Sequence, residues 1–365
     1  MKVLQVIPYM ETKYGGPVFV ATMISYFLNI GNIENKILSA YSLQAKKNSN
    51  VITYKKTSRF WFFSIDFLLN AHKEVKDCDC LLVHGVYSFF TFWTYVLALV
   101  YRKKIFLRPA GMLDVDSVFD GYKFKTLARL IYLIATGLFI YLISCKVIFN
   151  SSKEKCNSLL GFTRKAIILS NGIDPNIVNV KPKSKLFNKP YKLFFMGRLD
   201  PIKGIDLLIK AVKNLDAEIK KDVELIVAGD GRHDFVKRIK SQSCNNINYI
   251  GHIEGELKYQ YLKECDIYLQ PSKTEGLSNS MLEAMFCQVA IITTKNVGLA
   301  CELIEKDAAE VIDFDVAELT RSITKLIKSK ELVKRYKVNS FRFASKSYNF
   351  EKNIYNYIDI FKEPC

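Results

Sequence analysis

The chain has 365 residues, of which 49% are hydrophobic and 24% charged, and its formal net charge is +17. This composition indicates a globular protein with sizeable cores and excludes a disordered or collagen-like chain, while the length favours two domains. The basic excess is uneven: residues 1–180 hold 22 Lys and Arg against 11 Asp and Glu, and the remainder holds 31 against 25. A basic surface suits nucleic acid, anionic lipid or phosphorylated substrates, and composition does not choose among them.

The first half of the chain alternates short apolar runs with helical patterns. Residues 2–9 predict a buried strand without a cleavage site, so no signal peptide is expected, and residues 17–29 predict a helix. Further strands are expected at 36–41, 79–84, 105–108, 146–150 and 166–170. Strands separated by helix-length patterns predict βαβ units and a parallel sheet.

Two apolar helices in this half allow two interpretations. They span 89–101 and 130–145, and the second is a run of 16 residues without a charge. A membrane-spanning helix needs about 20 apolar residues, so neither is expected to cross a bilayer. They suit the buried helices of an α/β domain, but their aromatic residues and basic flanks are also typical of a protein resting on an anionic leaflet.

The second half repeats the alternation after a break. Prolines and lysines at 179–192 are typical of an interdomain linker. Strands are then expected at 192–197, 223–231, 247–251, 266–272, 289–294 and 309–313, followed by mostly helical residues at 316–362. The prediction is two doubly wound α/β domains in tandem, with ligands bound outside the carboxyl ends of the strands.

Cysteines and acidic triplets give no reason to expect a metal. The nine cysteines show no pairing pattern, so reduced thiols in the cytosol are expected. Cys78 and Cys80 lack a second pair at zinc spacing. Asp-x-Asp triplets occur at 77–79, 114–116 and 313–315, a number that chance explains among 36 acidic residues.

The stretch "KTEGLSNSMLEAM" at 273–285 holds two glutamates, Glu275 and Glu283, around a small polar turn. Ser278, Asn279 and Ser280 are good N-cap residues for the helix that follows, and a helix N-terminus binds phosphate. The carboxylates would accept hydrogen bonds from sugar hydroxyl groups. The stretch is therefore either an ordinary capped helix or part of a sugar-nucleotide site.

A second group of residues could hold a diphosphate. In "GRLDPIKGIDLLIKA" at 197–211, Arg198 and Lys203 flank a turn after a strand, where they could converge on phosphate oxygens. Gly15 and Gly16 follow the first strand and would let the backbone approach a ligand closely. The G-x-G-x-x-G fingerprint is not present in that turn.

Four ordered motifs carry a family resemblance. "FFMGRLDPIKGIDLLIKAV", "LIVAGDG", "YIGHI" and "PSKTEGLSNSMLEAM" resemble retaining glycosyltransferases of family 4, which have the GT-B fold. "GGP" at 15–17, "VHGVYS" at 83–88, "RPAGMLD" at 108–114 and "SNGID" at 170–174 resemble bacterial members that build surface polysaccharides or lipopolysaccharide. These members usually carry Arg and Pro where this chain has Ala110 and Val115. The motif on the expected acceptor-binding side therefore differs from that of the family at these two positions.

The resemblance implies an α/β GT-B fold, with two Rossmann-like domains facing a cleft and a terminal helix that crosses back to the first domain. The expected acceptor-side domain is 1–182 with helix 348–365, and the nucleotide-sugar domain is 183–347. The implied activity is that of a retaining, metal-independent hexosyltransferase. It would use a nucleotide-diphosphate sugar, UDP being the expected nucleotide, and no cofactor.

The resemblance also places roles on residues. Arg198 and Lys203 would hold the donor diphosphate, Glu275 the transferred sugar, and Glu283 the ribose. His84, at a strand end, would orient the acceptor or the donor sugar. The other implied donor-binding residues are Gly15, Gly16, Gly229, Gly276, Leu277, Ser278 and Asn279.

Two other functions remain as alternatives: a sugar-nucleotide epimerase of the same two-domain architecture, and a non-catalytic basic binding protein. No RNP or KH signature occurs, so nucleic acid is not expected as a partner. The expected acceptor is a saccharide or a lipid-linked one. The expected location is the cytoplasm, with peripheral contact at the inner face of the cytoplasmic membrane as an open question.

Overall fold

The computed structural model describes residues 1–11, 16–42, 50–58, 60–115, 118, 123–158, 160–161, 163–176, 189–243 and 246–363. The chain divides into two compact units, Met1–Asn171 with Phe350–Cys365, and Gly172–Asn349. Most of the expected linker at 179–192 and the expected boundary after residue 182 lie outside the described residues.

The first unit contains a parallel sheet of seven described strands in the order β3-β2-β1-β4-β5-β6-β7. The strands are β1 (Lys2–Val6), β2 (Glu34–Ala40), β3 (Val51–Tyr54), β4 (Cys80–His84), β5 (Lys104–Arg108), β6 (Lys146–Phe149) and β7 (Ala166–Ile168). Strand β3 was not predicted, because its four residues form too short a pattern to stand out. The other six lie where the apolar runs predicted them.

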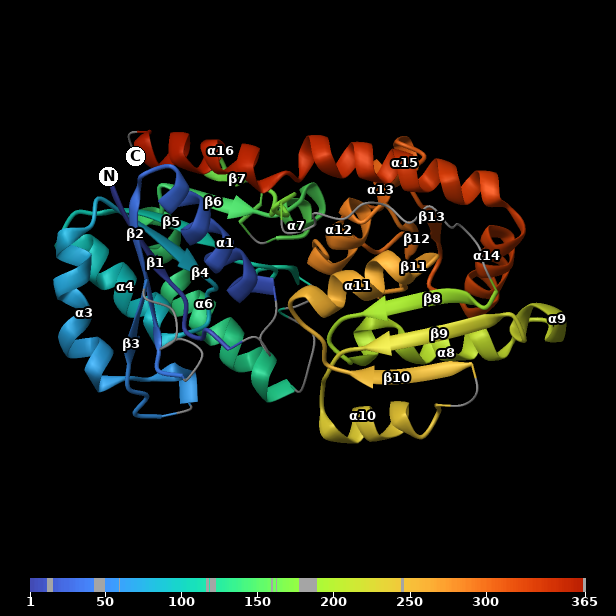
Figure 1. The fold of residues 1–365 in the computed structure, drawn as a ribbon. Coiled ribbons are helices and arrows are strands. Elements are labelled where there is room, and N and C mark those ends of the chain that lie inside the picture. Colours follow the sequence, from blue (N-terminus) through green and yellow to red (C-terminus); the bar gives the residue numbers. More distant parts are fainter. Residues whose placement is uncertain are drawn as a thin grey trace. The chain divides into compact units, whose positions relative to one another are not determined.

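Helices cover both faces of this sheet (Figure 1). They are α1 (Gly16–Ile30), α3 (Ile65–Asp77), α4 (Phe89–Val100), α6 (Lys123–Ile143), α7 (Ser152–Asn157) and α16 (Phe350–Lys362), with a short 3₁₀ turn η2 (Phe60–Phe62). Because successive strand residues point to opposite faces, Leu81 and Val83 pack with α3, α4 and α6, whereas Cys80 and Leu82 pack with α1 and α16.

The terminal helix α16 belongs to the first unit, as the resemblance implied. Its Phe350 ring stacks on Phe27 of α1 at 5.2 Å between centroids, and Phe361 meets Phe106 of β5 edge to face at 5.1 Å. Apolar residues at helical spacing thus dock the end of the chain onto the sheet face that α1 also covers.

Helix α6 departs from the expectation of a buried helix. It begins at Lys123, seven residues before the apolar run expected from the sequence. By length and composition alone it could cross a membrane over Thr126–Ile143, and only 6% of that stretch is buried. One side of the helix packs on the sheet through Tyr132, Leu133, Phe139 and Ile140, and its other side is open.

The second unit contains a parallel sheet of six described strands in the order β10-β9-β8-β11-β12-β13. They are β8 (Tyr191–Met196), β9 (Val223–Ala228), β10 (Ile247–Gly251), β11 (Ile267–Gln270), β12 (Ala290–Thr294) and β13 (Glu310–Ile312). The surrounding helices are η3 (Pro201–Lys203), α8 (Ile205–Lys213), α9 (Ala217–Lys220), α10 (His233–Lys240), α11 (Glu256–Glu264), α12 (Asn279–Phe286), α13 (Ala300–Glu305), α14 (Val316–Lys328) and α15 (Lys330–Ser347).

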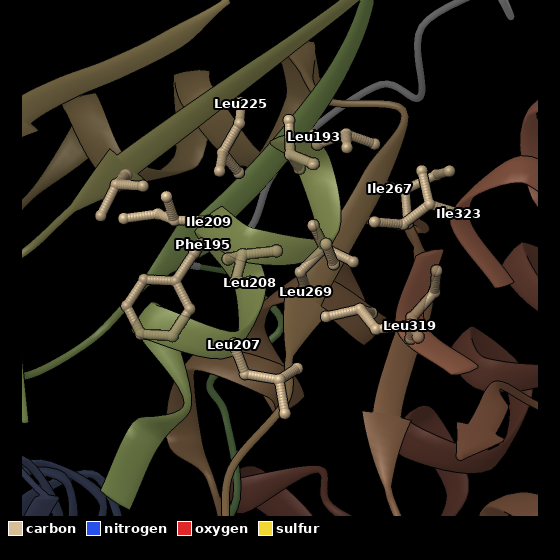
Figure 2. Packing of buried hydrophobic residues seen from close by; sticks show 14 of the residues in the cluster. Leu193, Phe195, Leu207, Leu208, Ile209, Leu225, Ile267, Leu269, Leu319 and Ile323 are labelled. Carbon is tan, nitrogen blue, oxygen red and sulfur yellow. The ribbon is translucent and has the colours of Figure 1, made fainter. Parts of the chain in front are cut away.

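Mostly aliphatic side chains fill the core on one face of this second sheet. Figure 2 shows residues of strands β8, β9 and β11 meeting residues of helices α8 and α14. On the opposite face, Phe194 of β8 stacks on Tyr261 of α11 with 5.7 Å between ring centroids. Both faces are therefore covered, as all-parallel sheets require.

The cysteines correct one expectation. Cys78, Cys80, Cys156, Cys265, Cys287 and Cys301 are free, but Cys145 is disulfide-bonded. Sequence spacing could not reveal this, because it does not show which thiols the fold brings together.

Candidate functional site

The motif residues of the second unit gather where its strand order reverses. The chain runs from β8 outward to β9 and β10, then returns to β11 on the other side of β8. In open α/β sheets, ligands bind at such a reversal, outside the carboxyl ends of the two central strands. Arg198 and Lys203 follow β8, and Glu275 follows β11, so all three lie beside this position.

A short turn holds Lys203 in place. The Asp200 carboxylate accepts a hydrogen bond from the Ile202 backbone N–H at 3.1 Å and caps η3. The Lys273 N–H donates to the Ile202 carbonyl oxygen at 2.7 Å. These contacts fasten the turn after β8 to the loop after β11.

Gly204 makes this close approach feasible. Its φ is 72°, in the left-handed region that favours glycine, and an added Cβ would lie 1.9 Å from the Pro271 carbonyl oxygen. The glycine of the "PIKG" motif is therefore a backbone requirement. It allows the turn that carries Lys203 to lie against the end of β11.

Lys203 and Glu275 form an ion pair across the strand reversal. The Lys203 Nζ donates to Glu275 Oε2, and each side chain is 16% exposed. Backbone bonds also anchor Glu275: its N–H donates to the Asn296 carbonyl at 3.3 Å, and its carbonyl accepts from the Gly298 N–H at 2.9 Å. The carboxylate is thus fixed in position with its charge balanced.

Arg198 supplies an additional positive charge. Its side chain is exposed and makes no hydrogen bond or ion pair with the residues that the structure describes. A guanidinium with five N–H donors is therefore available to an anion at the end of β8.

Helix α12 begins beside Glu275. The Ser278 hydroxyl accepts a hydrogen bond from the Met281 N–H at 3.3 Å, so Ser278 is the N-cap among the three residues that the sequence offered. Sequence reasoning missed the residue beneath this cap, Gln270 at the end of β11. Its Oε1 accepts from Ser278, Ser280 and Tyr268 at 3.1, 3.3 and 2.9 Å. A buried glutamine in an otherwise apolar strand was the available signal.

We expect Ser278→Ala to lower the free energy of unfolding by about 1 kcal/mol, because the helix loses its cap. Ser243→Ala removes the hydroxyl of an exposed serine without a side-chain partner among the described residues, and should change stability by less than about 0.5 kcal/mol. Urea unfolding of both variants checks this. Equal stability of the two would contradict the capping role.

Backbone N–H groups between the two glutamates are available to a ligand. Those of Gly276 and Leu277 make no hydrogen bond with described residues. A Cβ added at Gly276 would meet no atom within 4 Å, so the space beside this residue is open. Asn279 is the first residue of α12, where helix N–H groups carry partial positive charge.

Glu283 lies inside α12 and is 4% exposed. Lys258 of α11 donates to its Oε1 at 2.5 Å, and the Tyr259 hydroxyl lies 3.5 Å from the same oxygen. Burial raises the pKa of the Glu283 carboxyl, and the Lys258 charge opposes that rise. Oε2 has no hydrogen-bond partner among the described residues, so it can accept from a ligand hydroxyl. Sequence analysis missed Lys258 and Tyr259.

Gly229 lies at the end of β9, close to the backbone at the end of β8. Its φ is 143°, and an added Cβ would lie 1.8 Å from the Gly197 carbonyl oxygen. Its carbonyl accepts from the Tyr249 hydroxyl at 2.9 Å. The glycine allows the ends of β8 and β9 to lie close together, next to Arg198.

The first unit has its own strand reversal, between β1 and β4. Gly16 is exposed at the start of α1, and Gly15 lies outside the described residues. His84 ends β4 and is 2% exposed, with Nε2 at 2.9 Å from Gln5 Oε1. Burial, with a smaller contribution from Arg108, lowers the His84 pKa well below its usual value, so the ring is neutral.

Arg108, Asn150, Glu154 and Asn171 form a polar network within the first unit. The Arg108 guanidinium donates to the Asn150 and Asn171 side-chain oxygens. Glu154 accepts from the Gly111 N–H at 2.6 Å. Arg108 of the motif at 108–114 is thus joined to Asn171, although Ala110 and Val115 depart from the family pattern.

The groups gathered in the second unit are chemically suited to an anion beside hydroxyl groups. Arg198, Lys203 and the amides at the start of α12 suit phosphate, and Glu275 and Glu283 suit hydroxyl groups. Within the described ranges, no three His, Cys, Asp or Glu side chains are grouped as metal ligands would be.

Comparison with known proteins finds a family model that matches most of the second unit. Residues 177–343 match the family model described as "Glycosyl transferases group 1". This range covers most of the second unit, including Arg198, Lys203, Glu275 and Glu283. The match supports a group 1 glycosyltransferase.

The relatives agree with this match. An uncharacterised glycosyltransferase of Methanocaldococcus jannaschii is 34% identical over 186 residues, 50% of this chain and 47% of that protein. A second one from the same organism is 26% identical over 91% of this chain and 90% of its own length. An N-acetylgalactosaminyltransferase of Campylobacter jejuni that acts on a diphospho-undecaprenol saccharide is 27% identical over 44% of this chain and 40% of that protein. The chain thus spans about half the length of the first relative.

Solved structures show the fold. The crystal structure of Anabaena HepE in complex with UDP and glucose has a TM-score of 0.79 at 17% identity, over 100% of both chains. WaaG, a glycosyltransferase involved in lipopolysaccharide biosynthesis, has a TM-score of 0.74 at 15% identity, over 99% of this chain and 100% of that one. The chain has the two-domain α/β GT-B fold.

Proposed function

We propose that the protein is a retaining glycosyltransferase of family 4 that transfers a sugar from a UDP-sugar donor and needs no metal. The observation that carries the proposal is the group of Lys203, Glu275, Arg198 and the α12 N-terminus at the strand reversal of the second sheet. UDP is favoured because the Anabaena structure, similar in fold, holds UDP and glucose.

The positive groups of the site would bind and activate the donor. Arg198 and Lys203 would bind the diphosphate and stabilise the charge that develops on it as the glycosidic bond breaks. The amides of Gly276, Leu277 and the first turn of α12 would add donors in the same region. Fixed cationic and amide donors can supply the charge stabilisation that a metal ion provides elsewhere, which supports metal independence.

The two carboxylates would bind the two sugar rings of the donor. Glu275, positioned by Lys203 and by its backbone bonds, would accept from hydroxyls of the transferred sugar. Glu283 would accept from the ribose through Oε2, while Lys258 holds Oε1. Gly229 would allow the backbone at the end of β9 to approach the donor.

For retention, the acceptor hydroxyl would attack the face of the sugar from which UDP leaves. The glycosidic bond breaks with its electron pair going to UDP, the new bond forms to the acceptor oxygen, and that oxygen's proton passes to the leaving phosphate. Such a path requires no enzyme nucleophile. His84, neutral and at the β1–β4 reversal, and Gly15 and Gly16 remain proposed first-unit contributors.

The proposed acceptor is a saccharide or lipid-linked saccharide of a cell-surface polysaccharide, made in the cytoplasm. The Campylobacter relative acts on such a lipid-linked saccharide, and WaaG is involved in lipopolysaccharide biosynthesis. The reported relatives are glycosyltransferases, so neither an epimerase nor a non-catalytic binding protein is favoured.

The deciding experiment uses purified protein, a panel of UDP- and GDP-sugars, and membrane extract as the source of acceptor. We expect nucleotide release from a UDP-sugar, unchanged by EDTA, and a product whose anomeric configuration by NMR equals that of the donor. An inverted product or loss of activity with EDTA would contradict the mechanism. Release from no donor would refute the transferase assignment itself.

A further inference from the structure

Helix α6 presents an open face made only of aliphatic residues. Along Thr126–Ile143 its exposed positions are Leu127, Ala128, Ile131, Ile134, Ala135, Leu138 and Leu142. The larger of these recur at intervals of three or four residues, which places them on one side of a helix. Ile134 is 83% exposed and Leu138 is 68% exposed. Contiguous apolar surface of this kind marks an interaction site.

The opposite side of α6 packs on the first sheet, and this packing limits how the helix can contact a membrane. Tyr132, Leu133 and Phe139 pack against the core of the first sheet, and Ile140 is part of that core. The Tyr132 hydroxyl also donates to the Val86 carbonyl at 3.0 Å. A helix held on the sheet in this way cannot cross a bilayer, because its inner side would have to leave the core. It can lie along a surface over roughly 30 Å.

The charges around α6 indicate the chemistry of that surface. From 126 to 153 the chain has no Asp or Glu, and its charged residues are Arg129, Lys146 and Lys153. At the C-terminal end of the helix, Lys165 donates to the Tyr141 and Leu142 carbonyls at 2.9 Å. An apolar face bordered by basic residues is complementary to acyl chains beneath anionic headgroups.

We propose that α6 is a membrane-docking element that lies in the plane of an anionic bilayer, with Ile131, Ile134 and Leu138 among the acyl chains. A second copy of this chain would also cover the apolar face. That arrangement would bring together two surfaces from the more basic half of a chain with net charge +17, so repulsion opposes it. The inference rests on α6 alone and is independent of the transfer reaction.

The test is flotation of the purified full chain with vesicles, without any sugar nucleotide. The vesicles contain phosphatidylcholine alone or phosphatidylcholine with phosphatidylglycerol. We expect binding to the second kind, and at least roughly tenfold weaker binding for the double variant Ile134→Glu/Leu138→Glu. The matched control is Leu69→Glu on α3, which is 61% exposed and lies outside the stripe, and should bind like the unchanged protein.

Three results would overturn the proposal: no binding of the unchanged protein to anionic vesicles, equal binding by the double variant, or a dimer in solution that the double variant makes monomeric. Thermal unfolding of the variants shows that each is folded. Because donor turnover plays no part in the measurement, failure of this proposal and failure of the proposed activity remain distinguishable.

Discussion

Lys203→Ala is expected to lower kcat/KM for the donor by roughly 30- to 1,000-fold, a loss of about 2–4 kcal/mol in transition-state stabilisation. The ammonium group lies at the strand reversal, paired with Glu275, and the Ala variant removes the positive charge that would face the leaving diphosphate. Initial-rate measurements of nucleotide release over a range of donor concentrations give the value. Both kcat and kcat/KM should fall, because the leaving-group charge develops in the transition state.

A matched variant separates this effect from a general loss of charge. Lys210 is exposed on α8, the helix that directly follows the turn, and has no side-chain partner among the described residues. Lys210→Ala should keep kcat/KM within about twofold of the unchanged protein. If Lys203→Ala retains more than half of the original kcat/KM, the role assigned to Lys203 is wrong.

Lys258→Ala is expected to cost about 3–5 kcal/mol of unfolding free energy, because it leaves the buried Glu283 carboxylate without its partner. Lys263→Ala on the same helix removes an equal charge that has no ion pair among the described residues, and should cost less than about 0.5 kcal/mol. Urea unfolding provides both values. Adding Glu283→Gln to Lys258→Ala should restore most of the loss, since the uncompensated charge is then absent.

The cost of Lys258→Ala should depend on pH. The pKa of Glu283 in the folded protein lies above its ordinary value of 4.5, and removing Lys258 raises it further. A carboxyl with a raised folded-state pKa binds more protons folded than unfolded, so stability falls as pH rises from its ordinary pKa through the raised one. The loss should therefore be smaller at pH 4.5 than near pH 7.5, and a pH-independent loss would contradict this assignment.

Much of the fold was predictable because its signals are local. Alternating apolar runs and helix-length patterns predicted 12 of the 13 described strands, and the mostly helical stretch expected at 316–362 ends in α16 (Phe350–Lys362). The start of α12 was also predictable from neighbouring residues alone. Its N-cap, Ser278, is one of the residues whose type and position predicted a helix start.

The sequence by itself determined the residue types of the candidate site and their places at strand ends and at a helix start. Only the tertiary structure brought Lys203 to Glu275 across 72 positions, and Lys258 to Glu283 across 25. It also placed Gln270 under the α12 cap and left one face of α6 open. The physical reason is that strand order and helix packing depend on long-range burial, which short-range periodicity does not contain.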